Sequence, residues 1–216
     1  MVTRKSKRKP AENVSARELV RGYRAFRRKE RRDAMYKTAT FLVAHFWGKS
    51  SEIANSLGVL LLTWNQAHYR YGSFDFQALE RVLTTKQPQL ESFRHRDVLT
   101  YASDDDQVIT SLFNELLTAT RICEGERKGA KSPVAVAKAL HLLAPSYFPL
   151  WDRKIADAYG CNYARQPAAK YLVFLRAMKR IVEGLMSQGV VRSDATRTFL
   201  KVLDEYNYAK YTKGWI

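Results

Sequence analysis

The chain has 216 residues, with 37 lysines and arginines against 21 aspartates and glutamates, and its formal net charge is +16. Residues 1–32 hold 13 basic and 3 acidic side chains, a net charge of +10, and the remaining residues hold 24 and 18, a net charge of +6. With 46% apolar and 27% charged residues, the composition excludes a disordered chain. The charge favours a polyanionic partner, contacted mainly by the first 32 residues.

Turn-forming and metal-binding residues are scarce. The 10 glycines and 6 prolines are few for this length, which favours long helices over a many-stranded sheet.

The longest apolar run, 57–64, is too short to span a membrane, and no apolar signal-peptide core follows the basic start. Cys123 and Cys161 stand apart and the four histidines are dispersed, so we expect two reduced structural thiols, no metal and no cofactor. We expect a cytoplasmic protein.

The N-terminal charge falls into two segments. Residues 1–14 are typical of a flexible basic arm. Ser15 and Glu18 have the spacing of a capping box, which predicts a helix over about 16–33. Arginines recur on it at spacings of three and four and form one basic stripe. The stripe favours nucleic-acid backbone contact over a solvated tail; it comprises Arg17, Arg21, Arg24, Arg28 and Arg31.

The rest of the chain is also predicted to be helical. Helices are expected at 36–47, where strand is the alternative, at 51–68, and from a cap at Ser73 or Asp75 to Leu83. The stretch 84–101 is predicted to be irregular. Further helices are expected from 104–106 onward, from Ser132 and Pro133 to Ala144, from Asp152 to Gly160, and over 167–187 and 194–210. We predict an all-α protein in which 15–216 form one domain. Two helical lobes with a cleft between them, 36–150 and 15–35 with 151–216, are also compatible with the pattern.

One segment carries functional information. Residues 129–159 read GAKSPVAVAKALHLLAPSYFPLWDRKIADAY: a glycine-containing hairpin, a helix, a proline-containing connection, then an aspartate that opens another helix. This order resembles the helix-hairpin-helix, Gly-Pro-Asp superfamily of DNA glycosylases, most clearly over 104–159. The resemblance implies a compact helical fold, a hairpin that grips the DNA backbone, and a functional aspartate after the second helix.

Carried onto this chain, the family aspartate is Asp152 and the hairpin is 128–132. The hairpin departs from the family's Leu-Pro-Gly-Val-Gly pattern, because only Gly129 is present and Lys131 stands near a second glycine position. The lysine of bifunctional members would fall at 133–135, where there is none. We therefore expect a monofunctional enzyme. The expected DNA-backbone contacts are Arg127, Lys128, Gly129, Lys131, Ser132, Arg153, Lys154, Arg21, Arg24 and Arg28.

Cleavage of an N-glycosidic bond develops positive charge on the sugar. A carboxylate can stabilise that charge or activate water, and Asp152 is the candidate, although it also fits a plain N-cap. Lys138 would form an imine only if buried with a lowered pKa; a solvated or phosphate-facing lysine is the simpler interpretation. His141 is expected to be a half-buried residue with satisfied hydrogen bonds rather than a base.

Base excision from a duplex also needs a pocket for the flipped base. Aromatic and amide side chains that stack and hydrogen-bond cluster over 64–71, and Trp151 adjoins Asp152. Core packing explains the aromatic residues equally well. The predicted pocket residues are Trp64, Asn65, Gln66, Tyr69, Tyr71 and Trp151.

Three functions follow from these features. The first is a monomeric DNA glycosylase that acts on double-stranded DNA and removes either a lesion, in repair, or a modified phage base, in defence. The alternatives are a helical nucleic-acid-binding protein without catalysis, which the altered hairpin favours, and a helical protein with an acidic protein partner. None of the three involves a membrane.

Overall fold

The structure, a computed structural model, describes residues 13–30, 33–190 and 197–216. Within these ranges the chain is all-helical, as predicted, and contains no strand. Most of the predicted basic arm and Arg31 lie outside the described residues, as do 191–196. The α-helices are α1 (Ala16–Lys29), α2 (Ala34–His45), α3 (Ser50–Trp64), α4 (Gln66–Tyr69), α5 (Phe76–Thr85), α6 (Gln87–Arg94), α7 (Asp106–Ala119), α8 (Pro133–Leu143), α9 (Arg153–Ala158), α10 (Pro167–Ser187) and α11 (Phe199–Asn207).

Local capping explains where several helices begin. Ser15 and Glu18 form the predicted capping box, and the side chains of Ser132 and Asp152 each accept a hydrogen bond from the backbone N–H three residues later. At α5 the cap is Asp75 rather than Ser73, because the Asp75 carboxylate accepts bonds from two backbone N–H groups. These side chains satisfy N–H groups that have no partner inside the helix.

The prediction of an irregular segment at 84–101 is wrong. Helix α6 and the 3₁₀ turn η1 (Val98–Thr100) occupy it, followed by η2 (Ser103–Asp105). Pro88 stands in the first turn of α6, where a missing N–H costs no hydrogen bond, so the proline starts a helix there instead of breaking one. Leu90 and Phe93 of α6 are buried, and this packing stabilises a helix that its polar composition disfavours.

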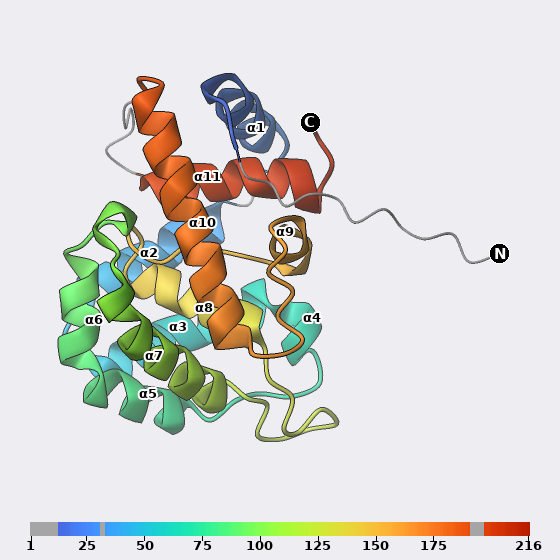
Figure 1. The fold of residues 1–216 in the computed structure, drawn as a ribbon. Coiled ribbons are helices and arrows are strands. Elements are labelled where there is room, and N and C mark those ends of the chain that lie inside the picture. The colour runs from blue at the N-terminus through green and yellow to red at the C-terminus, as the bar shows by residue number, and fades with distance from the viewer. Residues whose placement is uncertain (1–12, 31–32, 191–196) are drawn as a thin grey trace.

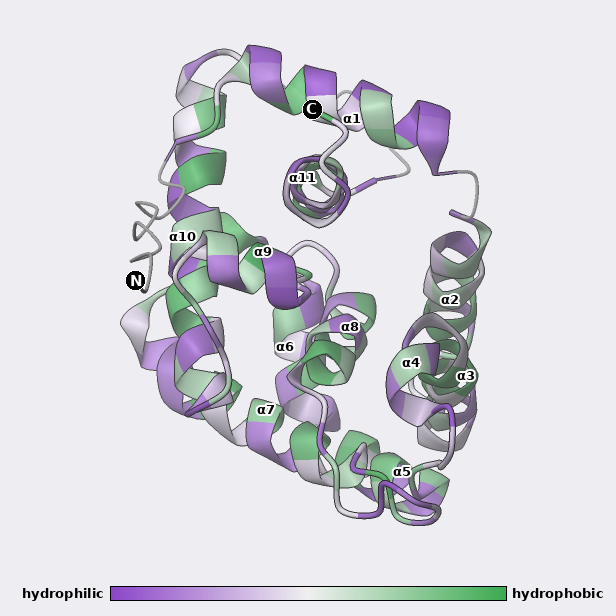
Figure 2. Ribbon diagram, turned by 90° about the vertical axis from the view of Figure 1, so that its right-hand side faces the viewer, coloured by the Kyte–Doolittle hydropathy of each residue, from purple (hydrophilic) through white to green (hydrophobic). Residues whose placement is uncertain are grey.

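Helix α8 lies at the centre of the fold. In Figure 1 it runs behind α10, and in Figure 2 its apolar surface is surrounded by the other helices. It contacts α2, α3 and α7, and residues 135–143 are all buried. Since this includes Lys138 and His141, two ionisable side chains are placed inside the core.

Helices far apart in sequence close the structure around α8. Helix α1 packs against α11, and α10 crosses α7 (Figure 1). After α11 the chain makes a π-helical turn, η3 (Tyr208–Thr212), and turns back at Gly214, which has φ +62°. Helices α1 and α11, from the two ends of the chain, therefore lie side by side, while α10 packs on α7. None of the described helices is long and apolar enough to cross a membrane. Cys161 is buried, Cys123 is half-buried, and both are free thiols.

Candidate active site

A cavity of about 590 Å³ lies where α8, α9 and α11 meet the C-terminal ends of α1 and α3. This volume falls in the range typical of small-ligand sites. Its lining residues come from 26–36 and 150–215, together with Trp64 and Lys138. Its charged and aromatic lining residues are Phe26, Lys29, Glu30, Asp33, Tyr36, Trp64, Lys138, Trp151, Asp152, Lys201, Asp204, Tyr208, Lys213 and Trp215.

Asp152 lines this cavity from the start of α9. Its Oδ1 accepts a hydrogen bond from the backbone N–H of Ile155 at 2.8 Å, which is the N-cap of that helix. Its Oδ2 accepts a hydrogen bond from the hydroxyl of Thr212 in η3. The predicted N-cap is therefore confirmed, and the residue is also half-buried in the cavity wall.

Lys138 reaches the same cavity from the middle of α8. The residue is only 9% exposed, and its Nζ donates to the backbone oxygen of Trp64 at 3.0 Å. The Nζ also lies 4.5 Å from the centre of the Trp64 ring and 3.4 Å from Oδ1 of Asn65. Burial lowers the pKa of Lys138 to about 8, although the carboxylates of Asp204 and Asp152 raise it in the opposite direction. The structure therefore buries this lysine, which excludes the solvated interpretation.

The lowered pKa of Lys138 makes stability depend on pH. A folded-state pKa of about 8 lies below the unfolded value, so between these values the unfolded chain binds more protons and stability rises with pH. From pH 7 to pH 10.5 we expect the wild-type protein to gain on the order of 3 kcal/mol of unfolding free energy relative to Lys138→Met. Urea denaturation at several pH values measures this difference. Replacement of the exposed Lys128 by Met is the control, and an equal pH dependence in both variants would contradict the burial of an ionisable Lys138.

A buried group of charges on α11 forms the cavity wall beyond Lys138. Lys201 is 2% exposed, and its Nζ lies 3.3 Å from Oδ2 of Asp204 and 3.6 Å from Oε1 of Glu205. Arg197 forms salt bridges to both Glu205 and Asp33. Burial raises the pKa of Asp204, while Lys201 lowers it. The cavity lining therefore contains three carboxylates besides Asp152, from Glu30, Asp33 and Asp204, and sequence reasoning missed them.

A buried hydrogen-bonded pair connects α2 to α8 beside this wall. The Nε2 atom of His141 lies 3.0 Å from the hydroxyl of Tyr36, and its Nδ1 lies 2.7 Å from the backbone oxygen of Phe148. Burial lowers the pKa of His141 to about 3, so the ring is neutral, donates through Nδ1 and accepts through Nε2. His141 has satisfied hydrogen bonds, as expected, but it is fully buried rather than half-buried.

The structure brings together only part of the predicted base pocket. Trp64 and Trp151 line the cavity on two sides, and the indole N–H of Trp151 donates to the backbone oxygen of Pro133. Asn65 lies beside Lys138 and donates to the hydroxyl of Ser132 at 3.0 Å, so it connects the end of α3 to the start of α8.

Besides Asn65, the other three residues of the predicted pocket are also absent from the cavity lining. Gln66 and Tyr71 are exposed. Tyr69 is 5% exposed, packs in the core and donates to the backbone oxygen of Thr120, as the alternative interpretation of the aromatic residues expects. The structure separates them because the helix predicted over 51–68 ends at Trp64, and the chain turns at Asn65 into α4.

The predicted hairpin is a closed loop between α7 and α8. Ile122 and Ala130 are joined by a backbone hydrogen bond, and Gly129 has φ +89°, a conformation that favours glycine. The loop lies on the same side of the molecule as α4 and α9 (Figures 1 and 2). Arg127, Lys128 and Lys131 are exposed on it. Ser132 is buried, and its hydroxyl already binds Ala135 and Asn65, so it is not available for the phosphate contact that the sequence predicted.

Basic residues also flank Asp152 on α9. The side chain of Arg153 is 81% exposed, and its only salt bridge within the described chain is a 4.0 Å contact to Asp157. Lys154 is exposed but donates to the backbone oxygen of Thr212. Both cations therefore lie next to the candidate carboxylate, and Arg153 is the freer of the two to contact a phosphate.

No protein-family model matches the chain, and no curated protein or solved structure matches it either. The described residues hold no group of three or more His, Cys, Asp or Glu side chains that is arranged to bind a metal ion. The cavity and its side chains are therefore the basis for a functional proposal.

Proposed function

We propose that this protein is a DNA N-glycosylase that binds a flipped base in the cavity and uses Asp152 as its functional carboxylate. The observation that carries the proposal is that Asp152, Lys138, Trp64 and Trp151 line one cavity. Such a cavity offers aromatic surfaces for stacking, a carboxylate for developing positive charge, and a buried amine.

The charge around the cavity supports a nucleic-acid substrate. Lys29 and Lys213 line the cavity itself, Arg153 flanks Asp152, and the loop before α8 exposes three more basic residues. Contacts of this kind hold a phosphate backbone without reading sequence, which is what an enzyme that selects a modified base needs. The base excised is either a lesion of the cell's own DNA or a modified base of phage DNA.

The chemistry assigned to Asp152 follows from its position. As the base leaves, the sugar gains oxocarbenium character, and a carboxylate on the cavity wall lowers the energy of that charge. The electron pair of the broken N-glycosidic bond leaves with the base, water adds to the anomeric carbon, and the proton that this water loses is balanced by the proton that the departing base takes up from solvent. The N-cap bond from Ile155 to one carboxylate oxygen holds the carboxylate in a fixed orientation.

A panel of substrates tests the proposal. The full chain is incubated with duplexes that each carry one alkylated, oxidised, deaminated or hypermodified base, and alkali then cleaves the products at abasic sites. We expect strand cleavage after alkali for at least one base class and none for the unmodified duplex. Tight binding to duplexes with no abasic site formed on any substrate would favour the non-catalytic nucleic-acid-binding protein instead.

A lyase step is a second candidate activity, and the burial of Lys138 favours it. A lysine with a pKa of about 8 is partly neutral near pH 8, and a neutral amine can add to the sugar aldehyde of an abasic site. Borohydride reduction would then trap a covalent complex with DNA. A trapped complex that disappears in Lys138→Ala would replace the predicted monofunctional mechanism with a bifunctional one, whereas no trapping would support the monofunctional mechanism.

A further inference from the structure

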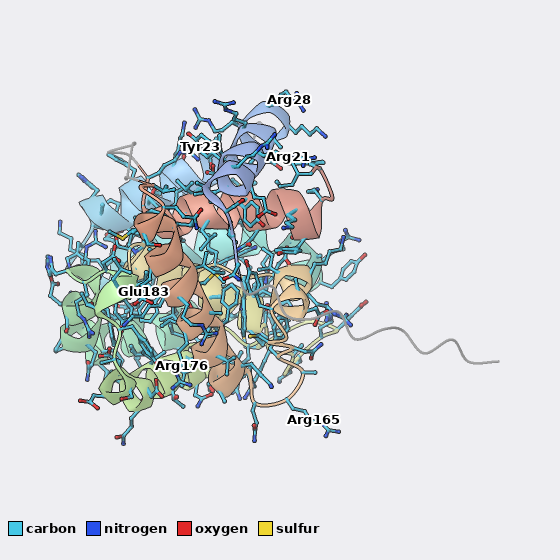
Figure 3. All side chains as sticks on the ribbon, turned by 45° about the horizontal axis from the view of Figure 1, so that its top comes forward. Arg21, Tyr23, Arg28, Arg165, Arg176 and Glu183 are labelled. Atoms are coloured by element: carbon cyan, nitrogen blue, oxygen red, sulfur yellow. The ribbon has the colours of Figure 1, made fainter. Side chains whose placement is uncertain are left out.

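A second hollow lies between α1 and the end of the described chain. This groove of about 810 Å³ is lined by Ala16, Arg17, Val20, Arg21, Arg24, Ala25, Arg28, Trp215 and Ile216. Four of these residues are arginines and none is acidic. The arginines lie on the outward surface of α1, and Figure 3 shows Arg21 and Arg28 projecting from that helix, far from Arg165.

The arginines of this groove are exposed and have no acidic partner among the residues that the structure describes. None of Arg17, Arg21, Arg24 and Arg28 forms a salt bridge with another residue of the described chain. The acidic residue of the first turn of α1, Glu18, is paired with Lys210 instead. Four cations at this spacing extend over about 16 Å of helix, which corresponds to roughly five phosphates along one strand of a duplex. The charge of the groove is therefore complementary to a nucleic-acid backbone.

Trp215 lies where this groove meets the candidate active site. Its side chain lines both the groove and the 590 Å³ cavity. The indole lies 5.4 Å from Nζ of Lys29 and makes an edge contact with Tyr208 at 5.9 Å. The turn at Gly214 and a 2.7 Å hydrogen bond from the Trp215 N–H to the oxygen of Ala209 place it there. Trp215 is half-buried and is not among the half-buried residues that pack on the core.

We propose that the groove and the cavity form one continuous path for a DNA strand, in which α1 binds the phosphates and Trp215 stacks against a base at the cavity entrance. Arginines together with an aromatic ring are the combination that proteins use to hold a strand by its backbone and a base by its face. This inference rests on the proposed function only for the identity of the base that enters the cavity. The binding itself does not depend on catalysis.

Binding of an unmodified, fluorescein-labelled 20-base-pair duplex, measured by anisotropy over a range of salt concentrations, tests the path. Arg21→Ala/Arg28→Ala removes two phosphate contacts, so the slope of log K against log salt should become shallower by about 1.8. The control is Arg81→Ala/Arg165→Ala, which removes two exposed arginines from other surfaces and should leave the slope unchanged. Equal slopes in both double variants would overturn the role of α1.

Trp215→Ala separates stacking from charge. On the same duplex carrying one unpaired, bulged base, we expect the affinity to fall about 5- to 100-fold with an unchanged salt slope, because the stacking of that base is lost and no cation is removed. Trp215→Phe should restore most of the affinity. Wild-type affinity in Trp215→Ala would overturn the stacking role.

The same assay distinguishes DNA from other polyanionic occupants of the groove, and it distinguishes the proposed path from the proposed glycosylase activity. Polyglutamate or anionic phosphatidylserine vesicles that bind more tightly than the duplex would overturn DNA as the occupant of the groove. Binding that follows the predicted slopes without base excision would leave the path intact and contradict the glycosylase. If both groove variants keep base excision and wild-type affinity for DNA, the path is contradicted and the glycosylase proposal remains intact.

Discussion

Asp152→Asn should reduce the rate of base excision by about 100- to 1000-fold on whichever duplex the wild-type protein cleaves. The loss is expected because the carboxylate charge that stabilises the sugar cation disappears, while the shape of the side chain is kept. Single-turnover kinetics at saturating protein measure this rate without a contribution from binding. DNA affinity should stay equal or improve, since a negative charge is removed beside a polyanion.

The structure makes Asp152→Asn a clean test of chemistry. Asparagine caps helices about as well as aspartate, so α9 keeps its cap at Ile155 and the fold should hold. The matched control is Asp157→Asn on the same helix, an exposed carboxylate outside the cavity, which should excise at the wild-type rate. Full activity in Asp152→Asn would refute the mechanism assigned to Asp152, although a glycosylase that uses another carboxylate would survive.

Arg197→Met should destabilise the protein by about 3–5 kcal/mol, the largest stability effect we expect from one substitution. The side chains of Arg197 and Glu205 are 4% and 0% exposed, and the arginine also pairs with Asp33. Its removal leaves Glu205 buried with only the 3.6 Å contact to Lys201. Thermal unfolding should show a Tm lower by roughly 6–20 °C.

A second variant separates the loss of this ion pair from a general packing defect. In Arg197→Met/Glu205→Leu both charges are gone, so much of the stability should return despite the larger change to the core. Arg180→Met, at an exposed arginine of α10, should unfold close to the wild-type temperature. If the double variant loses as much unfolding free energy as Arg197→Met and Glu205→Leu lose together, Arg197 and Glu205 do not act as a pair.

Sequence reasoning succeeded where the signal is local. The capping box at Ser15, the Ser132–Pro133 helix start and the Asp152 cap all depend on side chains that bind backbone within three residues, and all are present. The prediction for residues 84–101 failed because tertiary packing, rather than a local signal, decides their structure. Helix α6 is polar along most of its length, and it is stabilised by burial of Leu90 and Phe93 against other helices.

The candidate site was only partly predictable for the same reason. Lys138 and Asp152 belong to one segment of about 30 residues, so their proximity follows from the order of α8 and α9. Lys201 and Asp204 come from a helix 50 residues further on, and their i, i+3 spacing is also typical of a solvated helix surface. Only tertiary packing shows that these charges are buried, and the printed sequence contains no local signal for it.

The order in which the lining residues are synthesised has a consequence for the newly made protein. Nζ of Lys201 on α11 lies 5.0 Å from the Phe26 ring and 4.6 Å from the Tyr36 ring, and Trp215 also lines the cavity. A ribosome that has released the chain only as far as α10 holds a polypeptide that contains Lys138 and Asp152 but lacks the lining residues of α11 and Trp215. The cavity cannot be completed before residue 215 leaves the exit tunnel, so the base excision proposed for this protein is not expected of a nascent chain.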